Sequence, residues 1–267
     1  MKGEGYLFSY DATTTKIFEI APYIFFAAVG IVFAASLFIL LLLKYDYSIP
    51  RYTKIFAFSG IGMLIGAKIF GFLTGLYIAL ANRDPINTDT FLNTGIVFYG
   101  GMLGFLFSFL LICKIWNKQI DYGVFDLAVV CIPLFHFWGR FGCFFGGCCY
   151  GIESNSWLSV LYTHHIHEDI ITVSRIPIQL MEAVLNMATF VFLLKILSTQ
   201  NLKGCVLPIY LAIYATMRII LEFFRGDSVR GVWNGISFSQ VTSILILVNC
   251  ISLLLRIKSK EKKNESC

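Results

Sequence analysis

The chain has little charge for its length. Asp, Glu, Lys and Arg make up only 14% of the 267 residues, whereas 57% are hydrophobic and the mean hydropathy is +0.75. A soluble domain carries about 25% charged residues, so this composition argues against a soluble globular enzyme. The alternating strands of about ten residues that are typical of outer-membrane barrels are also absent. The sequence therefore predicts an all-α integral membrane protein.

The sequence shows neither an internal repeat nor a linker rich in Pro or Gly, so we expect one membrane domain over residues 1–267. A helix needs about 20 apolar residues to cross the hydrocarbon core, and seven runs of roughly that length predict seven transmembrane helices. The first run exceeds a signal-peptide core in length, so we expect it to remain as the first transmembrane helix. The predicted spans are Ile17–Leu43, Ile55–Leu80, Thr94–Trp116, Phe125–Phe145, Pro177–Leu197, Val206–Phe224 and Phe238–Ile257.

Lysines and arginines are distributed unequally between the two sets of span ends. Twelve lie on one side and six on the other, and the richer side is normally cytoplasmic. This predicts an N-terminus outside the cell and a C-terminus in the cytoplasm. Residues 148–176, the longest loop, would then form a small extracytoplasmic head. Because the basic residues are spread over several loops, no nucleic-acid partner is expected.

The most informative segment is residues 136–151, HFWGRFGCFFGGCCYG, at the end of the fourth run. An arginine inside a membrane helix costs about 2.5–3.5 kcal/mol on insertion scales, so we expect Arg140 to have an anionic partner or a function. The glycines let a backbone or a ligand approach closely. We interpret the segment as a site for a negatively charged headgroup at the lipid–water boundary. The alternative is an arginine that only snorkels from a helix end.

Polar residues in three other runs indicate a polar interior. Arg218 and Glu222 are spaced i, i+4, so they lie on one helix face and can pair, although such a pair can also serve packing alone. Gln179 and Glu182 follow the proline that begins the fifth run. In the third run Tyr99 precedes two glycines, and its hydroxyl needs a partner if it is buried.

The chain has eight cysteines, most of which are explained as small hydrophobic residues or as part of the C-terminal tail. Cys143, Cys148 and Cys149 instead cluster at the expected outer end of the fourth span, where disulfides can form. Four interpretations stay open: a disulfide, a thiol site, packing residues and a metal site. A metal site would add the histidines of the HHIH segment, whose spacing is not a standard ligand pattern, so no metal is predicted. These histidines are His164, His165 and His167.

Short segments along the chain form an ordered series. They are Tyr23 with Gly30, FYGGMLG at 98–104, GRFGCFFGGCCYG at 139–151, PIQLMEA at 177–183, RIILEFFR at 218–225 and SFSQ at 237–240. In this order they resemble the motifs of the phosphatidylglycerol–prolipoprotein diacylglyceryl transferase family, bacterial membrane enzymes that attach diacylglycerol to lipoprotein cysteines. The resemblance implies the helical membrane fold of that family.

Three positions depart from the family pattern. Tyr99 stands where the family has a histidine before Gly-Gly, and Cys143 and Cys148 stand at the asparagine and glutamate of its signature. Tyrosine, with an unperturbed pKa of about 10, is a weaker base than histidine at neutral pH. Two hypotheses therefore stay open: a transferase, or a re-purposed or non-catalytic relative that binds phospholipid or lipoprotein or modifies another lipid.

The resemblance implies transfer of the diacylglyceryl group of phosphatidylglycerol to the thiol of a lipobox cysteine in prolipoprotein signal peptides, within the bilayer of the bacterial plasma membrane. The thiolate would displace glycerol phosphate and form a thioether, while guanidinium groups would stabilise the leaving phosphate. No metal or other cofactor is required. The implied catalytic residues are Arg140, Arg218, Tyr99 and Glu222. The implied substrate-binding residues are Arg140, Tyr23, Gly100, Gly101, Gly139, Gly142, Cys143, Gly151, Gln179, Glu182 and Arg225.

Overall fold

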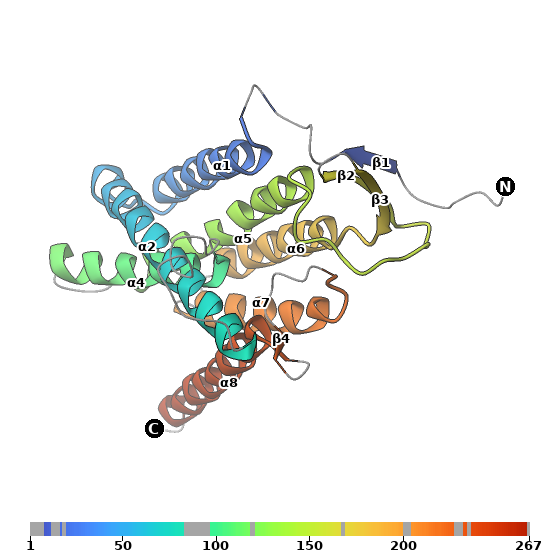
Figure 1. Ribbon diagram of the computed structural model, residues 1–267. Helices are drawn as coiled ribbons and strands as arrows, with labels where there is room; N and C mark the ends of the chain where they lie inside the picture. Colours follow the sequence, from blue (N-terminus) through green and yellow to red (C-terminus); the bar gives the residue numbers. More distant parts are fainter. Residues whose placement is uncertain are drawn as a thin grey trace.

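The computed structural model describes residues 8–11, 17, 20–82, 97–117, 121–166, 169–199, 204–226, 232–233 and 236–265, and within these ranges it holds seven α-helices (Figure 1). Each of the predicted apolar runs lies on one of them. Their bounds are α1 Pro22–Lys44, α2 Ile49–Asn82, α4 Phe98–Asn117, α5 Tyr122–Phe145, α6 Ile178–Thr199, α7 Val206–Glu222 and α8 Phe238–Glu265.

Five of these helices, α1, α2, α4, α5 and α6, are long and apolar enough to cross a membrane. Helix α7 has 17 residues, which is short of the about 20 that a span needs. Helix α8 is apolar only over Phe238–Leu253. The chain is thus a multi-pass helical membrane protein, and five of the seven predicted spans meet the length and composition of a transmembrane helix.

Several helix starts differ from the predicted runs, among them α2 at Ile49 and α4 at Phe98. Local signals explain two of the differences. Helix α5 begins three residues early, since the Asp121 carboxylate accepts hydrogen bonds from the backbone N–H groups of Gly123 (3.0 Å) and Val124 (3.3 Å) and so caps the helix. Helix α1 begins at Pro22 rather than at Ile17. Proline fits the first helical turn, where its missing N–H is not needed.

Helix α5 is the central element of the fold. It is buried along most of its length and contacts α1, α4, α6 and α7, whereas α1 and α6 are buried on one side only. The main core includes the fully buried side chains of Phe38, Phe109 and Tyr210. Outward-facing side chains are apolar too, such as Leu40 and Leu64, each 62% exposed. An apolar outer surface fits contact with lipid rather than with water.

Helices α2 and α4 pack closely because glycines face each other across their contact. A Cβ added to Gly66 would lie 2.3 Å from the carbonyl oxygen of Gly100, and one added to Gly104 would lie 2.2 Å from that of Gly62. No side chain fits at these distances, so the two backbones approach as they do in small-residue contacts of membrane helices. The glycines of the FYGGMLG segment therefore contribute to helix packing.

A three-stranded sheet lies beside the ends of α5 and α6 (Figure 1). Strands β2 (Val160–Ile166) and β3 (Asp169–Arg175) form an antiparallel hairpin within the predicted head at 148–176, and β1 (Phe8–Asp11) pairs in parallel with β2. Strands β4 (Val232–Trp233) and β5 (Ile236–Ser237) form a short pair before α8. The side chains of His164 and His165, and several residues used for the predictions, lie outside the described part of the chain: Lys2, Lys16, Arg83, Lys118, His167, Lys203 and Arg230.

Candidate active site

Polar side chains of α5, α6 and α7 meet in the interior around the carboxylate of Glu182, a residue that is only 4% exposed. Its Oε1 lies 3.0 Å from Nη1 of Arg218 on α7, and its Oε2 contacts Nε of Arg140 on α5. One carboxylate of α6 therefore joins the two arginines that the sequence analysis assigned to phosphate binding. Three consecutive helices are thus joined at this point.

The guanidinium of Arg218 has further partners besides Glu182. Its Nη2 lies 3.0 Å from Oε2 of Glu222, the pair that the i, i+4 spacing predicted, and donates a hydrogen bond to Oγ of Ser239 on α8 at 3.2 Å. These contacts come from three helices. They hold the positive charge in one orientation before any ligand binds, which is how a preorganised electrostatic site works.

Arg140 has a second partner on its own helix. Its Nε donates a hydrogen bond to Nε2 of His136 at 3.1 Å, so the imidazole accepts there and is neutral, with its proton on Nδ1. His136 is buried, and its ring stacks on that of Phe98 with 3.5 Å between centroids. Sequence reasoning missed His136 as a site residue, although its i, i+4 spacing from Arg140 was a readable signal.

The charges of this cluster balance. Arg140 and Arg218 carry two positive charges, and Glu182 and Glu222 carry two negative ones. Pairing is what makes their burial tolerable, since an unpaired buried charge costs several kcal/mol. Arg140 makes the two contacts above through Nε, so its Nη groups take no part in them. A Cβ added to Gly139 would meet no atom within 4 Å, so there is unfilled space one residue from Arg140.

Tyr99 is joined to the same cluster by hydrogen bonds. Its hydroxyl lies 2.6 Å from Oγ of Ser243, and that serine donates its proton to the carbonyl of Ser239 at 2.7 Å. Tyr99 is therefore the donor in the first bond, because a serine hydroxyl has only one proton. Its ring packs edge-on against Tyr214, with 5.1 Å between centroids. Since Ser239 also binds Arg218, α8 links the tyrosine to the arginine.

The glycines assigned to substrate binding occupy different surroundings. Gly100 packs against Gly66 of α2, and Gly101 is buried in the same helix contact. Gly142 allows α1 to approach, because a Cβ there would lie 3.1 Å from the Cα of Tyr23. The side chain of Tyr23 is 44% exposed. Helix packing thus accounts for the first three glycines, and of those assigned in α4 and α5 only Gly139 borders open space.

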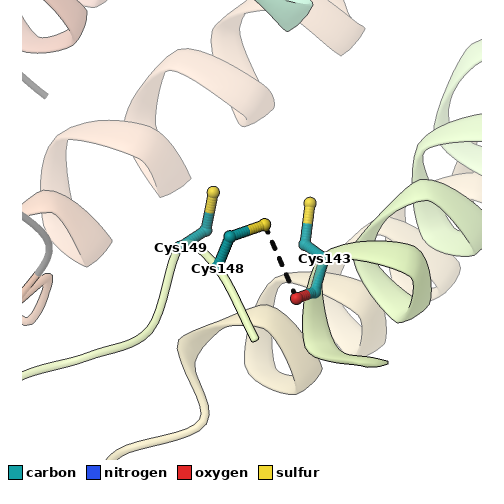
Figure 2. A group of neighbouring side chains, drawn as sticks. All are labelled: Cys143, Cys148 and Cys149. Atoms are coloured by element: carbon teal, nitrogen blue, oxygen red, sulfur yellow. Dashed lines mark hydrogen bonds between the residues drawn. The ribbon is translucent and has the colours of Figure 1, made fainter. Parts of the chain in front are cut away.

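The turn that ends α5 brings Cys143, Cys148 and Cys149 together (Figure 2). The N–H of Cys148 donates to the carbonyl of Cys143, and that of Gly147 to the carbonyl of Phe144, both at 3.1 Å. Gly147 has a φ of +62°. This is the hydrogen-bond pattern of a Schellman helix end, in which the residues at the positions of Cys143 and Cys148 come into contact. The three sulfur atoms lie within 4.8 Å of one another.

All three cysteines of this turn are free thiols. Cys149 adopts a φ of +61°, a left-handed conformation that is unfavourable for residues other than glycine. Hydrogen bonds from Cys143 and Cys148, together with the positive charges of Arg225 and Arg140, lower the pKa of the Cys149 thiol well below its usual value. Cys149 therefore lies within electrostatic range of both arginines.

Two other predicted residues hold this turn in place. The side-chain amide of Gln179 donates to the carbonyl of Cys148 at 2.7 Å and accepts from the hydroxyl of Tyr162 at 3.3 Å. Gly151 forms an isolated β-bridge with Arg225. Arg225 follows the two turn residues that come directly after α7. Arg225 itself is buried. These contacts join the turn to α6 and to the end of α7.

Comparison with known proteins decides the family. The sequence model of the prolipoprotein diacylglyceryl transferase family matches residues 11–256. The chain belongs to this family. Among similar proteins, a phosphatidylglycerol–prolipoprotein diacylglyceryl transferase 2 of Clostridium perfringens is 29% identical over 92% of this chain and 94% of its own length. Transferases of the same name from Clostridium tetani (29% identical, 70% of this chain and 73% of the relative) and Helicobacter hepaticus (28%, 89% and 86%) also match.

Four of the family segments quoted from the sequence meet in space at the Glu182 cluster, through Arg140, Glu182, Arg218 and Ser239. PIQLMEA begins α6 and carries Glu182, and RIILEFFR begins at Arg218 in α7. SFSQ starts α8 with a capping box, in which Ser237 and Gln240 exchange backbone and side-chain hydrogen bonds of 2.9 and 3.1 Å. This cap positions Ser239, the partner of Arg218. The family segments are therefore explained by the contacts that they make with one another.

Proposed function

We propose that this chain transfers the diacylglyceryl group of phosphatidylglycerol to the thiol of a lipobox cysteine in prolipoproteins, the activity that the names of its relatives describe. The observation that carries the proposal is the meeting of Arg140 and Arg218 on Glu182 within the helix bundle. Two fixed guanidinium groups inside a membrane protein suit the phosphate of a phospholipid headgroup.

The reaction forms one bond and breaks one. The thiolate sulfur attacks the glycerol carbon that bears the phosphate, a carbon–sulfur bond forms, and the carbon–oxygen bond to the phosphate breaks with its electron pair going to that oxygen. Glycerol phosphate leaves and a thioether remains. The negative charge that develops on the phosphate is stabilised by Arg140 and Arg218, while Glu182 and Glu222 keep the two guanidinium groups oriented.

The phosphate enters beside Arg140 in this proposal. Its Nη groups are not used by the contacts with Glu182 and His136, and the open space at Gly139 leaves room for the headgroup. Tyr23 lies within electrostatic range of Arg140 and borders the same region from α1. Tyr99 donates a hydrogen bond and supports the network rather than taking a proton. The remaining binding roles are proposed for Cys143, Gly151, Gln179 and Arg225, while Gly100, Gly101 and Gly142 contribute by letting the helices pack around the site.

The proposed topology has seven spans, with the N-terminus outside and the C-terminus in the cytoplasm. It rests on the loop charges and requires α7 and α8 to cross the bilayer together with the five longer helices. Residues 148–176 then form an extracytoplasmic head, and the cysteine turn faces outward. A phosphatase reporter fused after Cys267 should be inactive and a cytoplasmic reporter active; the opposite result would reverse the orientation.

The second candidate is a relative that binds phospholipid or lipoprotein without transfer. It is favoured by the three departures from the family pattern, at Tyr99, Cys143 and Cys148. A transfer assay distinguishes the two candidate functions, because a protein that only binds lipid does not transfer diacylglycerol to a peptide.

The test is transfer of labelled diacylglycerol from phosphatidylglycerol to a lipobox peptide by the purified protein. Arg140→Ala should abolish it, whereas Arg51→Ala, which changes an exposed arginine on α2, should leave it unchanged. If the unaltered protein gives no transfer under conditions in which one of the clostridial relatives does, the transferase proposal fails and the binding relative replaces it.

A further inference from the structure

The three thiols at the end of α5 form a cluster that the transfer step described above does not use. Figure 2 shows the sulfur atoms of Cys143 and Cys149 pointing to the same side, with the sulfur of Cys148 between them in this view. Each residue offers one sulfur atom, and the three lie within 4.8 Å of one another. The described residues contain no other group of three or more such side chains, from His, Cys, Asp or Glu, at this spacing.

The spacing suits a soft metal ion. A zinc ion binds cysteine sulfur at about 2.3 Å with tetrahedral geometry, which places two sulfur ligands roughly 3.8 Å apart. Sulfur atoms within 4.8 Å of one another lie close to this separation. Three soft thiolates without carboxylate ligands favour zinc over magnesium or calcium.

The backbone conformation that brings the three sulfur atoms together is unfavourable at Cys149. The Schellman turn brings Cys143 and Cys148 together, but the third sulfur requires Cys149 to adopt a φ of +61°. A left-handed conformation is unfavourable for a residue with a side chain, and glycine would avoid that cost. Gln179 fixes the Cys148 carbonyl from α6 at 2.7 Å. The thiol positions are therefore held by the surrounding structure.

The surrounding charge suits a thiolate–metal centre. Three thiolates with one divalent cation carry a net charge of minus one. Arg225 and Arg140 both interact electrostatically with Cys149, so positive charge stands next to the site. Arg140 also belongs to the proposed phosphate site. A centre at these cysteines would therefore lie beside the place where the leaving group departs.

We propose that Cys143, Cys148 and Cys149 bind a zinc-type divalent cation as three thiolates, and that the fourth tetrahedral position receives the thiol of the acceptor peptide. This rests on the proposed transferase function. A thiol that coordinates a metal loses its proton to solvent, so the cation generates the thiolate nucleophile. A zinc site with three protein ligands and one open position is the arrangement of catalytic centres. Tyr99, whose hydroxyl donates a hydrogen bond to Ser243, is then not needed as the base.

The test titrates the full-length protein, purified in detergent, reduced and freed of metal, with Co²⁺. We expect one Co²⁺ per chain, with the visible bands of tetrahedral thiolate coordination. Cys143→Ser, Cys148→Ser and Cys149→Ser should each weaken binding by roughly 100-fold or more. Cys113→Ser, which changes a buried cysteine of α4 in the main core, is the control and should bind as the unaltered protein does. A melting curve for each variant excludes loss of fold as the cause.

A lipobox peptide added to the Co²⁺ protein should shift the visible bands, while the same peptide with serine in place of cysteine should not. No Co²⁺ binding, or binding that the three serine variants retain, would overturn the metal site. Binding without a response to the peptide thiol would overturn its open fourth position. Transfer is measured in parallel. Co²⁺ binding without transfer in any metal state refutes the transferase proposal alone, and full transfer by the metal-free protein refutes the metal proposal alone.

Discussion

Replacing Glu182 with glutamine tests the structural basis of the site without reference to substrate. The change keeps the size of the side chain but removes the charge that pairs with Arg140 and Arg218 at once. The cluster then carries two positive charges and one negative charge in the helix bundle. Breaking a buried ion pair by removing one partner costs about 3–5 kcal/mol. With roughly 2–4 °C of Tm for each kcal/mol, we expect the Tm to fall by roughly 6–20 °C.

The assay is thermal unfolding in detergent, followed by circular dichroism. A matched control is Glu153→Gln, because Glu153 also pairs with an arginine at 3.0 Å, Arg175, but its side chain is 69% exposed. Such an exposed pair is worth about 0–1 kcal/mol, so the control should melt within a few degrees of the unaltered protein. If Glu182→Gln and Glu153→Gln have the same Tm, the charge of the Glu182 carboxylate does not stabilise the buried cluster, and charge balance does not explain its stability.

A double-mutant cycle measures the interaction free energy between Glu182 and Arg218. Arg218→Gln alone should destabilise the protein, because Glu222 loses its ion pair with Arg218 and Glu182 keeps only the one with Arg140. Adding Arg218→Gln to Glu182→Gln should then cost less than the sum of the two single changes, because residues in direct contact are coupled by about 0.5–3 kcal/mol. Strict additivity would show that the contact between these two side chains, at 3.0 Å, has no energetic weight.

Helix ends, helix packing and the Tyr99 hydrogen bond give three further tests. Asp121→Ala removes the cap of α5 and should lower the free energy of unfolding by about 1 kcal/mol without changing transfer per folded molecule, as measured by melting and transfer assays. Gly66→Leu should prevent α2 from packing on α4 and abolish the yield of folded protein, whereas Gly60→Leu should be tolerated because a Cβ there meets no atom within 4 Å; equal yields would contradict the packing. Tyr99→Phe should slow transfer less than about tenfold, the worth of one hydrogen bond, and Ser243→Ala should match it. A loss of about 100-fold or more confined to Tyr99→Phe would instead assign the tyrosine to proton transfer.

Much of the fold could be predicted because membrane helices are set by local composition. Every predicted apolar run lies on a helix of the structure, and Arg218 pairs with Glu222 as their spacing predicted. The ends were less predictable: capping by Asp121 moved the start of α5, and two helices are too short or too polar in part to qualify as spans by themselves. Local patterns determine which residues are helical, whereas side-chain contacts determine where each helix begins.

The site was only partly predictable, since its central contact is tertiary. The sequence indicated that Arg140 needs an anionic partner, but nothing local pointed to Glu182, which comes from another helix. His136 could have been found from its i, i+4 spacing to Arg140. Gly100 could not have been assigned to packing, because its neighbour Gly66 lies on α2. The sequence does not show which helices pack against each other. That arrangement decides which glycines lie in a helix contact and which face open space.

The cysteine turn shows how a local signal and a departure from a family pattern combine. Two glycines after an apolar run favour a helix end, and a Schellman end brings together the residues at positions 143 and 148. By the resemblance, these are the positions of the asparagine and glutamate of the family signature. In this chain both are cysteines, and Cys149 adds a third sulfur at the expense of a left-handed backbone. The turn of this chain therefore brings together thiols where the family signature has an amide and a carboxylate. The metal titration tests whether that chemistry replaces the missing base.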